Sequence, residues 1–335
     1  MTSRYAPLTA AILVLSALCL SGPAAAGPVD PGSDYLGQTP PGRAPAIFAP
    51  GIVSTGLAER DLAITPDGDE IYYSVVAPGH GVATIMVVRR IAGRWLAPEP
   101  ASFSGNPAHL DLEPAISPDG KRLFFLSNRP ASPGAEPGED IWVVERTAAG
   151  WSEPRNLGSP VNTPQAEYFP SVTNDGTLYF ARREPEGRAE FIYRSRPVDG
   201  RFQEPERLPD QVNAGAARFN AFVAPDESFI ILSVVGREDA ISPADYSVVF
   251  AAPDGGWHEP INLGQPINLP RVLGYSPYVS RDGKFFFFMS QRPSGALPDR
   301  RLTREDYRRL SDGPGNGQSD IWWVDSAVIT DLRPR

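Results

Sequence analysis

Residues 113–129 read EPAISPDGKRLFFLSNR, so two short apolar runs flank the turn Pro118-Asp119-Gly120. Proline presets the φ angle of such a turn, aspartate bonds its own backbone, and glycine accepts a positive φ. The runs on either side are rich in the branched and aromatic residues that favour strands. The stretch therefore predicts a β-hairpin.

The same pattern recurs five times along the chain. The turn aspartates are Asp67, Asp119, Asp175, Asp226 and Asp282, spaced by 52, 56, 51 and 56 residues. A third apolar segment follows each hairpin. In four copies we expect a fourth strand that begins at an aromatic residue, three positions before a proline; these aromatics are Trp95, Trp151, Phe202 and Trp257. Four short strands in a unit of about 54 residues are typical of a propeller blade.

The last copy lacks the fourth strand, and residues 45–53 align with it ahead of the first turn. We expect this N-terminal strand to complete the last blade, because closing the ring removes an exposed sheet edge. The sequence thus predicts an all-β fold. It is a five-bladed β-propeller with four-stranded antiparallel blades, closed by an N-terminal strand, and six blades are the alternative.

The N-terminus has the features of an export signal. Residues 1–26 contain Arg4, an apolar run over 8–20 and an alanine-rich end, which predicts a signal peptide cleaved near Ala26. The run is too short to span a bilayer, so we expect a periplasmic or secreted protein with no membrane span. Lipidation at Cys19 is the alternative, and cleavage near Ala26 removes this only cysteine.

The rest of the chain is expected to form one domain. Residues 27–44, rich in glycine and proline, are predicted to be a flexible leader, and residues 45–335 a single propeller. The last blade carries an insertion at 293–319, in which Thr303 begins a capping-box pattern. This pattern predicts one helix of about two turns.

Net charge limits the range of partners. The chain carries −9 and has no basic cluster, which argues against nucleic acid or an anionic membrane surface. We expect a monomer.

Several segments resemble a known repeat. Residues 113–129 and 278–292, together with Asp140-Ile141-Trp142 and Asp320-Ile321-Trp322, are similar to the WD-like repeat of TolB-type bacterial periplasmic proteins, also called the PD40 repeat. The resemblance implies an exported propeller, but it does not imply the role of TolB, because residues 27–44 are too short for the additional N-terminal domain of that protein. We expect the partner to be a protein or peptide in the cell envelope. The fourth repeat departs from the pattern, because Glu227 replaces the turn glycine.

Acidic residues gather where the first strand of a blade begins. Because this strand lines the channel of a propeller, the loops that enter it form one rim, where ligands are expected to bind. The predicted ligand-binding rim consists of Glu59, Arg60, Asp61, His109, Asp111, Glu113, Glu167, Arg218 and Asn220.

Three interpretations of the rim remain open. In the first, the acids belong to the bonding pattern of the repeat or to a solvated surface. In the second, they bind a cation such as Ca²⁺ or a basic peptide. In the third, they catalyse glycoside cleavage, with Asp61, Glu113 and Glu167 as acid and base or nucleophile. We predict no other cofactor, and the histidines have no metal-binding spacing.

No motif for nucleophilic catalysis or phosphate binding is present. We therefore predict a non-catalytic propeller that binds a protein or peptide partner, with a polysaccharide hydrolase or lyase as the alternative. Two arginines after the second strand are expected to pair with acids of the third, Arg129 with Asp140 and Arg292 with Asp320.

Overall fold

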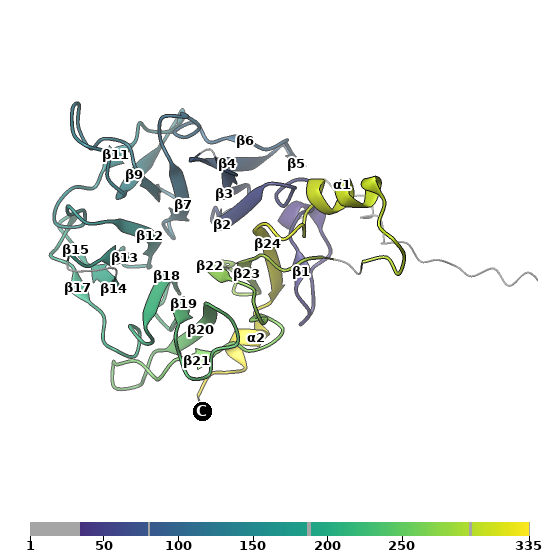
Figure 1. The fold of residues 1–335 in the computed structure, drawn as a ribbon. Helices are drawn as coiled ribbons and strands as arrows, with labels where there is room; N and C mark the ends of the chain where they lie inside the picture. The colour runs from purple at the N-terminus through teal and green to yellow at the C-terminus, as the bar shows by residue number, and fades with distance from the viewer. Residues whose placement is uncertain (1–33, 80, 186–188, 295–296, 335) are drawn as a thin grey trace, which may run out of the picture.

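The computed structural model describes residues 34–79, 81–185, 189–294 and 297–334. In this part of the chain, five four-stranded antiparallel sheets surround a central channel as the blades of a β-propeller (Figure 1). The predicted all-β, five-bladed fold is confirmed. The predicted signal peptide, Cys19 and the first residues of the predicted leader lie outside the described residues.

The four strands of each blade follow one another from the channel outward. Blade one contains β2 (Ala58–Ile64), β3 (Glu70–Ala77), β4 (Val82–Ile91) and β6 (Glu99–Pro100). Blade two contains β7 (Asp111–Ile116), β8 (Arg122–Ser127), β9 (Asp140–Thr147) and β11 (Arg155–Asn156). Blade three contains β12 (Glu167–Val172), β13 (Leu178–Arg183), β14 (Glu190–Ser195) and β17 (Glu206–Arg207). Blade four contains β18 (Ala217–Val223), β19 (Phe229–Val235), β20 (Asp245–Phe250) and β21 (Ile261–Asn262). Blade five contains β22 (Gly274–Val279), β23 (Phe285–Ser290), β24 (Asp320–Asp325) and β1 (Ala46–Ile47).

The Asp-Gly turn joins the first and second strands of a blade. In blade two, the Ser117 hydroxyl donates to Asp119 Oδ1 over 2.6 Å, and the Lys121 backbone N–H donates to the same oxygen over 3.0 Å. These bonds favour the ionised carboxylate and lower the pKa of Asp119, although partial burial opposes them. The turn therefore ends the strand that lines the channel at the same level in each blade.

The ring closes through β1, as predicted. β1 pairs antiparallel with β24, with Ala46 opposite Trp323. Phe48 follows β1, is fully buried and meets the Trp323 ring edge-on at 5.3 Å. An N-terminal segment thus supplies the outer strand of the last blade.

The residues just before β1 differ from the flexible leader that we expected. The short 3-10 helix η1 (Tyr35–Gly37) packs on blade five. The Tyr35 ring meets Phe285 edge-on at 5.0 Å, and Leu36 is buried. Sequence reasoning missed this anchor because the surrounding residues are mostly glycine, proline and polar groups.

The prediction that the fourth strand begins at the aromatic residue is wrong. Trp95 lies in β5 (Arg94–Trp95) and Trp151 in β10 (Gly150–Trp151), and both pair with the end of the third strand. A glycine with positive φ precedes each aromatic and permits the tight reversal. The outer strands β6 and β11 begin only after the proline.

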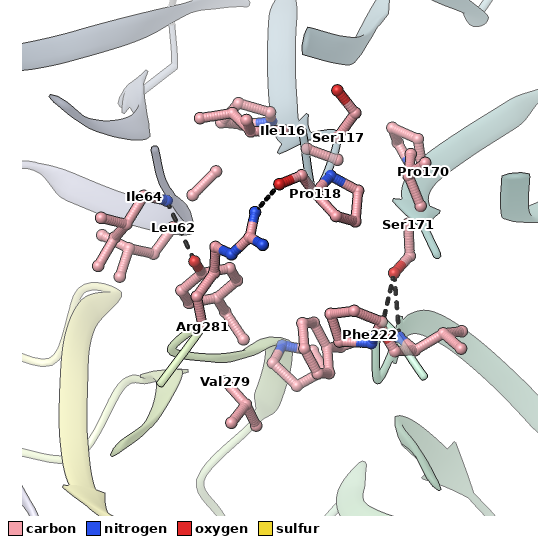
Figure 2. A pocket seen from close by; sticks show the side chains of 18 of the residues that line it. Leu62, Ile64, Ile116, Ser117, Pro118, Pro170, Ser171, Phe222, Val279 and Arg281 are labelled. Carbon is pink, nitrogen blue, oxygen red and sulfur yellow. Dashed lines mark hydrogen bonds between the residues drawn. The ribbon is translucent and has the colours of Figure 1, made fainter. Parts of the chain in front are cut away.

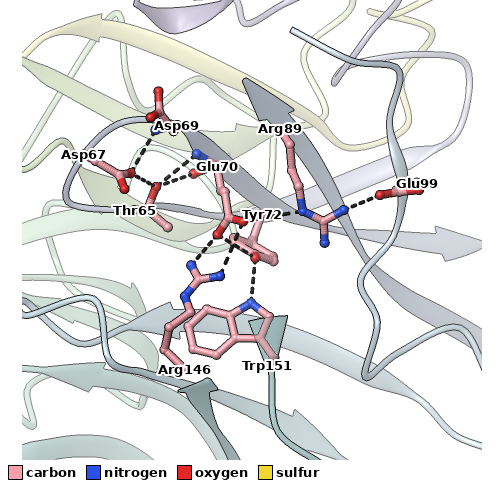
Figure 3. A network of polar contacts seen from close by, with 9 residues as sticks. All are labelled: Thr65, Asp67, Asp69, Glu70, Tyr72, Arg89, Glu99, Arg146 and Trp151. Carbon is pink, nitrogen blue, oxygen red and sulfur yellow. Dashed lines mark hydrogen bonds and ion pairs between the residues drawn. The ribbon is translucent and has the colours of Figure 1, made fainter. Parts of the chain in front are cut away.

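The displaced aromatics pack between blades, and Figure 3 shows the seam between blades one and two. Trp151 Nε1 donates to the Tyr72 hydroxyl over 2.7 Å, and that hydroxyl donates to Glu70 Oε2 over 2.9 Å. Arg146 pairs with Glu70 and lies 3.9 Å from the centre of the Trp151 ring. The seam is therefore held by packing and by a shared carboxylate.

The insertion of blade five contains a helix and extends away from the ring (Figure 1). α1 (Arg304–Asp312) begins at Thr303, whose side chain accepts from the Asp306 backbone, while the Asp306 side chain accepts from Thr303. A second helix, α2 (Ala327–Thr330), follows β24 and was not predicted. Within the described ranges, neither helix is long and apolar enough to cross a membrane.

Candidate functional site

Three of the predicted rim acids are buried within their own blades. Glu59, Asp111 and Glu167 have no exposed surface. Asp111 accepts from Arg129 Nη2 over 2.6 Å, and Glu167 accepts from Arg182 Nε over 2.8 Å. Glu59 accepts from the hydroxyl and the backbone N–H four residues earlier. The structure therefore places these acids in the bonding pattern of the repeat and away from an open rim.

The predicted pairing of Arg129 and Arg292 is wrong. Ser127 Oγ accepts from Arg129 Nε over 2.9 Å, which turns the guanidinium toward Asp111 of the first strand and away from Asp140. Arg292 donates to two backbone carbonyl groups, including Pro266 O at 2.9 Å, instead of Asp320. Both arginines thus brace the loop that enters the first strand.

A ring of residues in left-handed backbone conformation surrounds the channel. One residue per blade, six positions before the turn aspartate, has a φ between 50° and 64°. Each sits at a β-bulge, where the pairing of the first strand shifts register. The five residues are Asp61, Glu113, Phe169, Asn220 and Ser276. The bulge places these residues at one level of the channel.

One cation joins three blades at this level. Arg60 Nε donates to Asp61 Oδ1 over 2.9 Å, and Arg60 Nη2 donates to Glu113 Oε1 over 2.8 Å. The other oxygen of Glu113 accepts from the Phe169 backbone N–H over 2.7 Å. The Asp61 and Glu113 residues are only 3% and 5% exposed. Two acids of the predicted rim therefore converge, but inside a bonded network.

The remaining blades complete the network. The Ser276 hydroxyl donates to Asp61, and Asn220 Nδ2 donates to Ser276 Oγ over 3.3 Å. The Arg60 guanidinium lies 4.5 Å from the centre of the Tyr275 ring. We call Arg60 and the five bulge residues the closed layer, because all five blades contribute and every carboxylate oxygen has a partner.

The closed layer changes the acidity of Glu113. Burial raises the pKa of Glu113 to about 8, and the negative charge of Asp61 adds to the rise, while Arg60 opposes it. A raised pKa is a property of a general acid. Substrate would nevertheless have to displace the partners of both carboxylate oxygens to reach this group.

The other predicted rim residues lie apart from the closed layer. Arg218 donates to the backbone carbonyl groups of Ala214 and Gly215, at 3.1 and 2.5 Å. His109 lies half-buried in the turn before β7. In the described ranges, no group of three or more His, Cys, Asp or Glu side chains is arranged to hold a metal ion.

An open pocket lies at the turn end of the channel, and Figure 2 shows it. The space within and in front of it is about 630 Å³ with open solvent included, whereas the space open to the centres of water molecules is about 70 Å³. The first strands of all five blades contribute mainly apolar residues. Among these residues are Leu62, Ile64, Pro114, Ala115, Ile116, Phe169, Pro170, Phe222, Pro277, Tyr278 and Val279. We call this cavity the turn-end pocket.

The pocket and the closed layer share one residue. Phe169 lines the pocket, and its backbone N–H donates to Glu113 of the closed layer. The pocket and the closed layer are therefore adjacent at Phe169. No carboxylate is among the described lining residues, and the one charged side chain there is Arg281.

Our sequence reasoning did not single out the pocket residues, although two signals were present. Proline follows the bulge residue in three copies, at Pro114, Pro170 and Pro277, where it cannot donate to a strand ladder. Arg281 occupies the turn position that holds proline or asparagine in the other four copies. The predicted acids lie at the opposite end of the same strands.

Neither a family model nor a curated protein sequence matches the chain. Similar solved structures include TolB from Acinetobacter baumannii, at 15% identity and a TM-score of 0.45, with 81% of this chain and 57% of that chain covered. The putative TolB from Agrobacterium tumefaciens has 16% identity and a TM-score of 0.44, with 80% of this chain and 90% of that chain covered. A glycoside hydrolase has 11% identity and a TM-score of 0.49, with 88% of this chain and 92% of that chain covered. This chain thus spans little more than half of the Acinetobacter protein, and similarity at this level carries no argument about function.

Proposed function

We propose that the protein is a non-catalytic binding module of the periplasm or the cell exterior, which takes an apolar part of a peptide or protein partner into the turn-end pocket. The observation that carries this proposal is an open, apolar pocket to which all five blades contribute. Filling such a pocket removes apolar surface from water on both molecules.

The size of the pocket limits the expected affinity. Full burial of one leucine- or phenylalanine-sized side chain contributes about 1.5–3 kcal/mol. Association also costs translational and rotational freedom. We therefore expect weak, reversible binding by the pocket alone, and tighter binding where a partner also contacts the turns around the mouth.

The alternative, cleavage of a polysaccharide by Asp61 and Glu113, requires both carboxyl groups to reach a glycosidic bond. Their side chains are almost fully buried, and Arg60, Ser276 and a backbone N–H occupy their oxygens. Exposing them would leave the partly buried guanidinium of Arg60 without its partners. These contacts favour binding over hydrolysis.

A charge placed in the pocket tests the proposal. Ala115 is half-buried in the pocket lining, and Ala131 is exposed in the loop after β8. The probe is the pentapeptide Gly-Ser-Gly-Ser-Leu with fluorescein at its N-terminus, and fluorescence polarisation reports binding. We expect Ala115→Asp to abolish saturable binding and Ala131→Asp, the matched control, to retain it.

An assay on a polysaccharide panel distinguishes the alternative. We expect no turnover by the wild-type protein. Turnover that Glu113→Gln abolishes, in a variant that keeps its melting temperature, would contradict the proposal.

A further inference from the structure

Arg281 departs from the repeat at a position that faces the pocket. Blade five carries Arg281-Asp282-Gly283 where blade two carries Pro118-Asp119-Gly120. A proline there only shapes the turn, whereas an arginine adds a long side chain with a charged end. The substitution therefore provides a cation at the mouth of an otherwise uncharged pocket.

The Arg281 side chain reaches across the channel. Its Nη1 donates to the backbone carbonyl oxygen of Pro118, and Figure 2 shows this contact over the pocket. Pro118 belongs to blade two, which is not a neighbour of blade five in the ring. The guanidinium thus lies above the apolar lining and not in a seam between adjacent blades.

This guanidinium retains unused capacity for hydrogen bonds. Among the described residues, its hydrogen-bond partner is one neutral carbonyl group, and no carboxylate pairs with it. A guanidinium offers five N–H donors in a planar fork that matches a carboxylate. Arg60, in the closed layer, is already bonded to the carboxyl groups of Asp61 and Glu113.

We propose that the turn-end pocket binds the C-terminal end of a polypeptide chain, with the terminal carboxylate on Arg281 and an apolar last side chain among Ile64, Ile116 and Phe222. This inference rests on the proposed function and names the part of the partner that is recognised. It makes Arg281 the residue that determines specificity.

The geometry favours a chain end over an internal segment. The closed layer lies next to the pocket and links the blades by hydrogen bonds, so we expect the pocket to take the end of a chain. In a terminal residue one α-carbon carries both a carboxylate and a side chain, so the carboxylate reaches the mouth while the side chain points inward. Successive side chains of an extended internal segment point to opposite sides, and an acidic residue cannot place its apolar neighbour in the same pocket.

The test compares peptides that differ at the chain end. The probes are N-terminally labelled Gly-Ser-Gly-Ser-Leu as free acid and as amide, and Gly-Ser-Gly-Leu-Glu as amide. We expect the free acid to bind at least tenfold more tightly than either amide. Arg281→Gln should remove this difference. Lys284→Gln, which changes an exposed cation in the same turn that pairs with Asp282, should preserve it.

Each other outcome overturns the inference in a recognisable way. If the free acid and the amide bind equally, and Ala115→Asp abolishes the binding of both, the proposed function stands but recognition of the terminal carboxylate is excluded. Tight binding of the amide that ends in Leu-Glu would show that the pocket recognises an acidic side chain and not the end of a chain. A difference that persists in folded Arg281→Gln would remove Arg281 as the determinant. No binding of any probe would overturn the inference and the proposed function together.

Discussion

The channel holds two arginines with opposite surroundings, Arg60 in the closed layer and Arg281 at the mouth of the turn-end pocket. Arg60 is bound by two buried carboxylates in the closed layer, whereas Arg281 is exposed and bonded to one backbone carbonyl group. Bonds satisfied within the protein stabilise the ring but leave nothing for a ligand. We infer that the closed layer maintains the fold and that the turn end is available for binding.

The largest expected effect comes from removing the cation of the closed layer. Because the pKa of Glu113 is about 8, this group is largely protonated at neutral pH. Arg60→Met therefore leaves mainly Asp61 buried without its counter-charge, and breaking a buried pair in this way costs about 3–5 kcal/mol. Urea denaturation at neutral pH measures the loss. Adding Asp61→Asn to Arg60→Met should restore part of it, because this change removes the unpaired charge. A cost below about 1 kcal/mol would contradict the inference that the bonds of Arg60 in the closed layer maintain the fold.

The closed layer should also make stability depend on pH. A carboxyl group whose folded pKa is raised contributes its stability fully below the unfolded pKa, about 4.3, and loses it as the pH rises through the folded pKa. For Glu113 that folded pKa is about 8. The free energy of unfolding of the wild type should therefore fall relative to Glu113→Gln by about 1–3 kcal/mol between pH 5 and pH 8.5. Parallel pH profiles of the two proteins would contradict this.

The seam between blades one and two should show an intermediate effect. Glu70 and Arg146 pair at a partly exposed position beside Trp151. A double-mutant cycle with Glu70→Gln and Arg146→Met should give a coupling energy of about 1 kcal/mol, because solvent screens the pair. A coupling as large as the cost of Arg60→Met would place the principal stabilising charge in the seam.

The smallest effect is expected at the turn end. Arg281→Gln should change the free energy of unfolding by less than about 0.5 kcal/mol, as exposed substitutions away from a network do. Thermal denaturation of the variant beside the wild type measures it. Destabilisation of several kcal/mol would mean that Arg281 braces the ring, and the contrast with Arg60 would disappear.

Much of the fold follows from local chemistry in the sequence. The turns around Asp119 and its equivalents marked five hairpins, and the unpaired third strand of the last blade required the segment at 45–53. The position of Trp151 did not follow from the sequence. An aromatic residue before a proline is compatible both with a reversal after a glycine, where Trp151 lies, and with the start of an outer strand, where we expected it. The packing of Tyr35 and Leu36 depends on a surface that exists only once blade five is complete.

The site was less accessible to sequence reasoning. Spacing assigned Asp61 and Glu113 to the same repeat position, but it could not show that bulges and Arg60 would bury and bond them. Glu167 occupies a different repeat position and turns into its own blade. The turn-end pocket had no motif, because its apolar residues also resemble those of an ordinary inner strand; only the change from proline to Arg281 distinguished it.

Methyl NMR with the Gly-Ser-Gly-Ser-Leu peptide as free acid is the most direct measurement. Ile64 and Ile116 line the turn-end pocket, whereas Ile91 is 57% exposed on the outer part of blade one. With isoleucine methyl groups labelled, the account predicts saturable shifts of Ile64 and Ile116 and an unchanged Ile91. Saturable shifts at Ile91 with Ile64 and Ile116 unmoved would place binding outside the pocket and contradict the account.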